Sequence, residues 1–178
     1  MLERAFAAGG PCAWVVAATV YGRDHRLRMY LEAHGQPFVV AMPAHEPLWG
    51  GGPAYYKASA LAPQVAPEPW RRGSAGDGAK GPRWYDGAVV ERWRLQQPEA
   101  ALAWGHSLLV RRAVEDPSDL ASYVVFARRQ GLSLATLARV AGSRWPIEAA
   151  LEAATGDGGL DEYEVRKGPA WKRHITLA

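Results

Sequence analysis

The sequence has one cysteine, no long apolar run, and no two histidines at metal-ligand spacing. Cys12 alone cannot close a disulfide within the chain or build a cysteine metal cluster. No apolar run approaches the roughly 20 residues that a membrane-spanning helix needs. Residues 1–10 are too weakly apolar for a signal peptide. We therefore expect a cytoplasmic protein with no membrane partner.

Concentrated positive charge is also scarce, although the formal net charge is +3. A dedicated nucleic-acid-binding protein usually carries its basic residues in one stripe. Here the basic pairs are scattered along the chain, at 71–72, 111–112, 128–129 and 172–173. Solvated faces and a composite DNA-facing surface both stay open as interpretations. Tryptophan is abundant, with eight residues, which suits core anchors and a few ligand-cleft walls.

The first part of the chain predicts a strand, a helix and a second strand. Residues 11–20 form an apolar, β-branched run of strand length, which indicates a strand buried on both faces. Asp24 is a helix cap for 25–34, and Gly35 ends that helix. Residues 37–43 predict the second buried strand. This order favours a right-handed crossover and a parallel pair of strands.

The rest of the chain predicts further strands and two helices. Residues 43–82 hold most of the proline and much of the glycine, so an irregular insertion with little regular structure is expected. Strands are predicted at 84–95, 107–114 and 121–129, the last two antiparallel. Ser133 caps a predicted helix, and a helix containing Glu148 follows. The whole predicts one α/β domain over 1–178, with a mixed sheet and flanking helices.

Several stretches resemble one protein family. They are GDGAKGPRWYDGA (76–88), AGSRWPIEAALEAATGDGGLDEYEVR (141–166), WKRHITLA (171–178) and the strand-helix-strand segment 13–47. Together they resemble the catalytic domain of bacterial insertion-sequence transposases of the DDE type, in the branch common in actinobacteria. The resemblance covers nearly all of the chain. It implies an RNase H-like mixed sheet flanked by helices, truncated relative to the family.

That family uses three acids to hold two divalent metal ions. By resemblance the first acid lies upstream of the matched segments, the second matches Ala18, and the third matches Glu148. A methyl group cannot bind a metal, and the lysine expected after the third acid is Thr155. The tyrosine expected before the motif is Ala141. The resemblance therefore implies a lost metal site, no cofactor, and no DNA strand transfer.

Two interpretations of Glu148 stay open. It is either a first-turn helix acid that interacts favourably with the helix dipole and with Arg144, or a catalytic carboxylate in an inherited cleft. The resemblance gives that cleft a pocket lined by Ala18, Tyr21, Trp145 and Thr155. It also makes Lys80, Arg83 and Arg144 candidate inherited DNA contacts, beside the simpler interpretation of basic surface residues.

Two classes of function follow from these residues. The favoured one is a repurposed small-molecule, biosynthetic enzyme or cyclase-type catalyst, in which the old cleft performs acid–base chemistry or shapes a substrate. The alternative is a noncatalytic DNA-binding remnant or regulator, and a decayed product without function is a third possibility. Whether the chain is an enzyme is therefore left open, and its partner is a small molecule or DNA.

The resemblance also predicts the assembly. A truncated sheet would leave the apolar strand around Trp14 at an open edge, and natural proteins do not leave such an edge bare. A second copy related by a two-fold axis would cover it. We therefore predict a homodimer.

Overall fold

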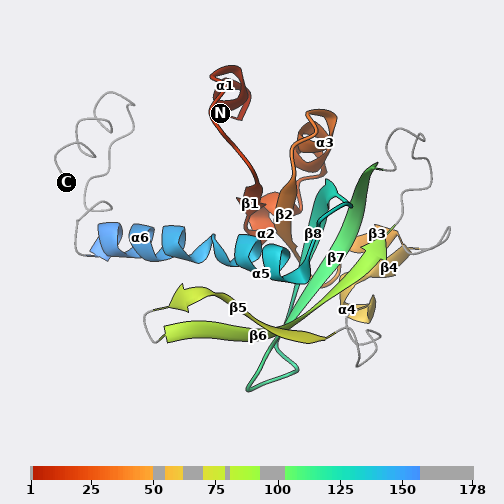
Figure 1. The fold of residues 1–178 in the computed structure, drawn as a ribbon, viewed down its shortest axis with the longest axis vertical. Coiled ribbons are helices and arrows are strands. Elements are labelled where there is room, and N and C mark those ends of the chain that lie inside the picture. Colours follow the sequence, from red (N-terminus) through yellow and green to blue (C-terminus); the bar gives the residue numbers. More distant parts are fainter. Residues whose placement is uncertain (1, 50–54, 62–69, 79–80, 93–102, 157–178) are drawn as a thin grey trace. The chain divides into compact units, whose positions relative to one another are not determined.

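The computed structural model describes residues 2–49, 55–61, 70–78, 81–92 and 103–156 (Figure 1). The chain divides into two compact units, Met1–Gly142 and Ser143–Ala178. The first contains a mainly antiparallel sheet with helices, and the described part of the second contains helix α6 (Trp145–Gly156). The predicted α/β class is confirmed. The prediction of one domain over 1–178 stays a prediction.

The main sheet has six strands in the order β1-β2-β8-β7-β6-β5. Only β1 and β2 are parallel, and every other neighbouring pair is antiparallel. The strands are β1 (Val15–Ala17), β2 (Phe38–Met42), β5 (Arg71–Gly78), β6 (Gly81–Arg92), β7 (Trp104–Ala113) and β8 (Leu120–Arg128). A separate pair joins β3 (Pro47–Trp49) to β4 (Tyr55–Lys57). The helices of this unit are α1 (Leu2–Ala7), α2 (Thr19–Gly22), α3 (His25–Ala33), α4 (Ala58–Leu61) and α5 (Leu134–Gly142).

The predicted strand-helix-strand segment is confirmed in its main features. The Asp24 carboxylate accepts hydrogen bonds from the Arg26 and Leu27 amides, at 2.9 and 3.3 Å, and so caps α3. Gly35 follows the C-cap residue with φ +58°, a conformation that favours glycine. The antiparallel pairing of β7 with β8 is confirmed as well.

The predicted strand over 11–20 is wrong in extent and in burial. Of this stretch only Val15–Ala17 pairs as a strand, and these residues are half-buried because β1 lies at the edge of the sheet. The chain then turns into α2, where the Gly22 amide donates to the Ala18 carbonyl at 2.9 Å. Val20 is consequently 77% exposed. The local helical turn and the edge position override the strand propensity of the β-branched residues.

The expectation of little regular structure over 43–82 is also wrong. This segment contributes β3, β4, α4 and the eight-residue strand β5, which forms a hairpin with β6. A bulge between Ser74 and Asp77 absorbs the irregularity of a glycine-rich sequence. Gly76, at φ +98°, occupies that bulge. Cross-strand pairing thus supplies the order that the local sequence lacks.

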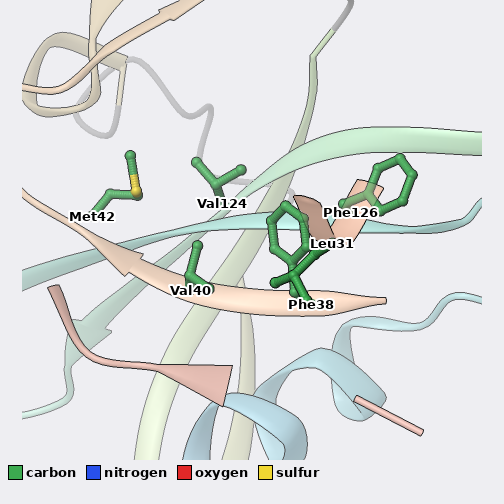
Figure 2. Packing of buried hydrophobic residues seen from close by; sticks show 6 residues of the cluster. All are labelled: Leu31, Phe38, Val40, Met42, Val124 and Phe126. Atoms are coloured by element: carbon green, nitrogen blue, oxygen red, sulfur yellow. The ribbon is translucent and has the colours of Figure 1, made fainter. Parts of the chain in front are cut away.

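One face of the sheet packs against α3. Phe38 pairs with Phe126 and Val40 with Val124, so alternate side chains of β2 and β8 share this face. Figure 2 shows them gathered with Leu31 of α3. The rings of Phe38 and Phe126 stack with centroids 5.6 Å apart. Burial of these side chains provides the main stabilisation of this layer.

The opposite face packs against α5. Leu137 of α5 is fully buried in a cluster with Val39, Leu109 and Val125. The Ser133 hydroxyl accepts a hydrogen bond from the Thr136 amide at 3.1 Å, which confirms Ser133 as the cap. At the other end of α5, a Cβ on Gly142 would collide with the Ala75 carbonyl. Glycine therefore allows α5 to approach the backbone of β5 closely.

Candidate functional site

Two residues of the predicted cleft lie at the end of β1. Ala18 is the N-cap of α2 and is half-buried, with no side-chain hydrogen bond to the helix. Tyr21 lies within α2 and is 64% exposed. The backbone thus turns at Ala18 as a strand runs into a helix, and the aromatic ring of Tyr21 is accessible.

The other predicted cleft residues belong to the second unit. Trp145 begins α6 and is half-buried, and Arg144 precedes it and is also half-buried. Glu148 lies in α6, but its side chain is outside the described part of the structure. The Thr155 hydroxyl donates to the Leu151 and Glu152 carbonyls, both at 3.0 Å. Its polar atom is therefore used within the helix.

The residues present do not fit the metal pair that the transposase resemblance implies. Ala18 offers only a methyl group at the position that matches the second acid. In the described parts of the chain, no three His, Cys, Asp or Glu side chains gather as a metal would require. Divalent ions such as Mg²⁺ need oxygen ligands and concentrated negative charge. No chemical step is therefore assigned to a metal.

A cationic and aromatic group that sequence reasoning missed lies across β5, β6 and β7. We call Trp70, Arg72, Asp86 and Arg112 the Asp86 cluster. The Asp86 carboxylate accepts from Arg72 Nε at 3.0 Å and from an Arg112 terminal nitrogen at 3.4 Å. The Arg112 guanidinium lies over the Trp70 ring, 4.3 Å from its centroid. A cation over an indole face is a favourable electrostatic contact.

The two arginines determine the charge state of Asp86. The hydrogen bond from Arg72 lowers the pKa of the Asp86 carboxyl, and the charges of Arg72 and Arg112 act in the same direction. Partial burial opposes this change. Asp86 is therefore ionised at neutral pH. It holds the two guanidinium groups in place and leaves one positive charge in excess.

The opposite face of the same strands carries a second arginine contact. The Arg111 guanidinium lies over the Tyr85 ring, 4.1 Å from its centroid. Arg71, on the neighbouring strand β5, is exposed. Trp84 lies two residues before Asp86 on β6, so it shares the face of the Asp86 cluster, and it is 53% exposed. Arg83 precedes it on β6 and is half-buried. The predicted contact Lys80 lies outside the described residues.

The strand register brings together arginines that are far apart in the sequence. Arg72 is opposite Asp86, and Asp86 is opposite Arg112. In the adjacent row, Arg71 is opposite Gly87, and Gly87 is opposite Arg111. The pairs at 71–72 and 111–112, scattered in the sequence, thus share one end of the sheet. The arginine doublets are visible in the sequence, but only the strand register shows that they lie together.

Negative charge lies next to this surface along the chain. The turn between β7 and β8 begins directly after Ala113 and carries Glu115, Asp116 and Asp119, all exposed. The hydrogen bonds from Ser118 lower the pKa of the Asp116 carboxyl. This turn is therefore acidic at neutral pH. It places negative charge close in sequence to Arg111 and Arg112 at the end of β7.

A polar pair also links α3 to β7. His106 Nε2 lies 2.9 Å from a Glu32 carboxylate oxygen, with the side chains 13% and 11% exposed. The His106 ring lies 5.1 Å from that of Phe126. Such a pair is chemically competent for acid–base work. However, His106 Nδ1 is buried and has no hydrogen-bond partner in the described chain, so no ligand reaches it in this conformation. We assign the pair to positioning α3.

Comparison with known proteins adds no family. No protein-family model matches the chain, and no curated protein matches it in sequence. The helices within the described ranges include none with the length and apolar character needed to cross a membrane.

Proposed function

We propose that this chain is a transposase-derived protein, of RNase H-like ancestry, that has lost strand transfer and binds nucleic acid without cleaving it. The observation that supports this function is the arginine surface at the end of β5, β6 and β7. At these strand ends Arg72 and Arg112 lie on one face together with the exposed Trp84, and Arg71 and Arg111 lie on the other face. This was the alternative function from the sequence, and the register favours it.

The chemistry of the surface suits a phosphate backbone. Guanidinium groups form bidentate hydrogen bonds with phosphate oxygens, and each neutralised phosphate releases counterions. A two-stranded ribbon has dimensions that the major groove of DNA accepts. An exposed indole can also stack on an unpaired base. Because the acidic turn lies close by and Asp86 offsets one arginine, the expected binding is weak and sequence-independent.

Fluorescence anisotropy with a labelled duplex tests the proposal. Affinity should fall steeply as salt rises from roughly 50 to 200 mM, because counterions are released on binding. Arg71→Ala should weaken binding and reduce the slope of log K against log salt by about 1. Asp86→Asn should instead raise the affinity, since it removes the carboxylate that offsets Arg72 and Arg112.

A matched control separates this surface from general positive charge. Arg26→Ala removes one exposed arginine on α3, so it changes the net charge as much as Arg71→Ala does. It should leave the affinity nearly unchanged. Equal losses for the two variants, or no binding by the wild-type protein at low salt, would reject the proposed surface.

A second candidate function is the small-molecule enzyme favoured from the sequence. Half-buried Trp145 at the start of α6 supports it, because a partly exposed indole offers an aromatic wall to an organic substrate. In this proposal Glu148 is the acid–base group. Thermal-shift screening of a small-molecule panel would identify ligands. Trp145→Ala and Glu148→Gln should then each abolish the shift, and a shift kept by both variants would place the ligand elsewhere.

Loss of strand transfer has its own test. Supercoiled DNA incubated with the protein and Mg²⁺ or Mn²⁺ should stay intact, because Ala18 replaces a metal-binding acid. Metal-dependent nicking that disappears in Glu148→Gln would overturn the interpretation of a lost site. We expect both results together: the protein does not cleave DNA, and it still binds DNA with an affinity that falls steeply with salt.

A further inference from the structure

A hollow on the first unit lies between the bulge of β5 and helix α5. Its volume is about 390 Å³, and it is lined by Ser74, Gly76, Ala135, Thr136 and Arg139. None of these residues belongs to the cleft predicted from the sequence or to the arginine surface. The hollow is open to solvent, and it is larger than an inorganic phosphate ion.

Local structure determines the shape of the hollow. The β-bulge between Ser74 and Asp77 bends β5, with Gly76 at φ +98°. A Cβ built on Gly76 would meet no atom within 4 Å, so the space beside this residue is open. The close approach of Gly142 to Ala75 holds the far end of α5 against β5. The hollow is therefore supported by two packed elements.

The polar side chains around the hollow are the hydroxyls of Ser74 and Thr136 and the positively charged guanidinium of Arg139. Thr136 and Arg139 are three residues apart on α5, so they share a helix face. The exposed Arg139 guanidinium forms no ion pair or hydrogen bond with the described residues. The Ser74 hydroxyl contacts the Gly76 backbone, and the Thr136 hydroxyl lies 2.9 Å from that of Ser133. Each hydroxyl is thus held in position at the rim.

We propose that this hollow binds a small molecule through a phosphate monoester group. The guanidinium of Arg139 matches the geometry of phosphate oxygens. The Thr136 hydroxyl is a further donor when it accepts from Ser133, whereas the Ser74 hydroxyl donates to the Gly76 carbonyl. Ala135 and Gly76 leave room for a compact organic group beside the phosphate. The volume lies within the range of small-molecule sites. This inference is independent of nucleic-acid binding, because the arginine surface contributes no residue to the hollow.

Calorimetric titration with phenyl phosphate tests the site. Wild-type protein should bind it, and Arg139→Gln should weaken the affinity at least tenfold. Ala135→Leu should weaken it to a similar degree, because the larger side chain fills the hollow without changing the charge. Arg26→Gln, which removes an exposed charge on α3 outside both the hollow and the arginine surface, should change the affinity less than twofold. Circular dichroism of each variant verifies that it is folded.

Two further probes, phenol and an oligonucleotide, test which group the hollow recognises. Phenol should not bind, and equal binding of phenol and phenyl phosphate would show that the phosphate is not recognised. Unchanged affinity in Arg139→Gln, or no binding by the wild-type protein at millimolar phenyl phosphate, would overturn the site. An oligonucleotide without terminal phosphates should bind equally to wild type and Arg139→Gln. If the variant loses that binding, the hollow belongs to the nucleic-acid surface instead.

Discussion

Two regions of the main sheet differ in the side chains that they carry. We call β2 with β8 the buried end, and β5 with the start of β6 the charged end. On β2 and the middle of β8 most residues are buried and, apart from Ser122, belong to the hydrophobic core, and helices α3 and α5 cover the two faces. On β5 and the start of β6, arginines, a carboxylate and an exposed Trp84 replace the apolar residues. The first end provides stability, and the second presents charge and aromatic surface. Substitutions at the two ends should therefore have separate effects on folding and on binding.

The largest expected effect lies at the buried end. Phe38 is fully buried and stacks on Phe126 beneath α3. Phe38→Ala should lower the free energy of unfolding by about 3–5 kcal/mol, because it removes apolar contacts and leaves a cavity. Urea denaturation followed by circular dichroism measures this loss. A loss below about 1 kcal/mol would contradict the assigned core.

The junction of α5 with β5 connects the two ends. Gly142→Ala would place a Cβ against the Ala75 carbonyl, and the backbone cannot give way easily there. We expect a loss of about 1–3 kcal/mol, typical of overpacking. Gly73→Ala, on the strand that holds Ala75, is the control, because its Cβ would meet nothing within 4 Å. Equal stability of the two variants would show that α5 does not contact β5 as described.

A smaller effect of pH is expected at the charged end. The folded state lowers the pKa of Asp86 below 3.8, so its stabilising contribution is present above that pH and is lost as the pH falls through the lowered value. Asp86→Asn should destabilise the protein at pH 6. The difference between variant and wild type should shrink as the pH falls below 3.8.

Comparing variant with wild type at each pH removes the contribution of other carboxyls, including Asp116. A difference that grows on acidification would mean that the Asp86 pKa is raised instead. The same variant also tests binding, since it should bind nucleic acid more tightly. Stability and affinity then change in opposite directions at neutral pH.

Local sequence predicted the parts of the fold that local interactions determine. The Asp24 and Ser133 caps follow from patterns within a few residues, the antiparallel pair β7–β8 follows from a short connection, and the parallel pair β1–β2 follows from the order strand, helix, strand. The strand over 11–20 failed because its apolar composition does not reveal that Ala18 begins a helical turn at the sheet edge. Periodicity cannot separate a buried strand from an edge strand that ends early.

The candidate surfaces were harder to predict for a different reason. Arg72 and Arg112 meet at Asp86 only in one register of three strands, and a bulge near Gly76 lies in one of them. A shift of one residue in the pairing of β6 with β5 or β7 would place Asp86 and the arginine of that strand on opposite faces. The hollow beside Arg139 likewise depends on how closely α5 approaches β5. Pairing of distant strands and helix packing distances are not encoded in any short motif.

The smallest expected effect on folding concerns the predicted homodimer. The β1 strand does lie at an edge of the sheet, as the dimer hypothesis requires. The Val15 amide donates to the Pro37 carbonyl at 2.9 Å, so alternation directs the Val16 amide toward the open edge. Val20 and Tyr21, which are 77% and 64% exposed, follow this edge in sequence and add apolar surface. Because β1 has only three residues, a dimer formed here would be weak.

Val20→Lys tests this edge with little cost to the monomer. Val20 lies in α2 beside the β1 edge, so a lysine there places a charge in the apolar surface that a second copy would cover, and an exposed position tolerates it within about 0.5 kcal/mol. Light scattering should show wild-type protein moving from monomer toward dimer as concentration rises, and the variant should stay monomeric. Lysine in place of Met29, which is 50% exposed on α3, is the matched control and should dimerise as wild type does. Wild-type protein that stays at 19.4 kDa across this range would show that β1 does not recruit a second copy.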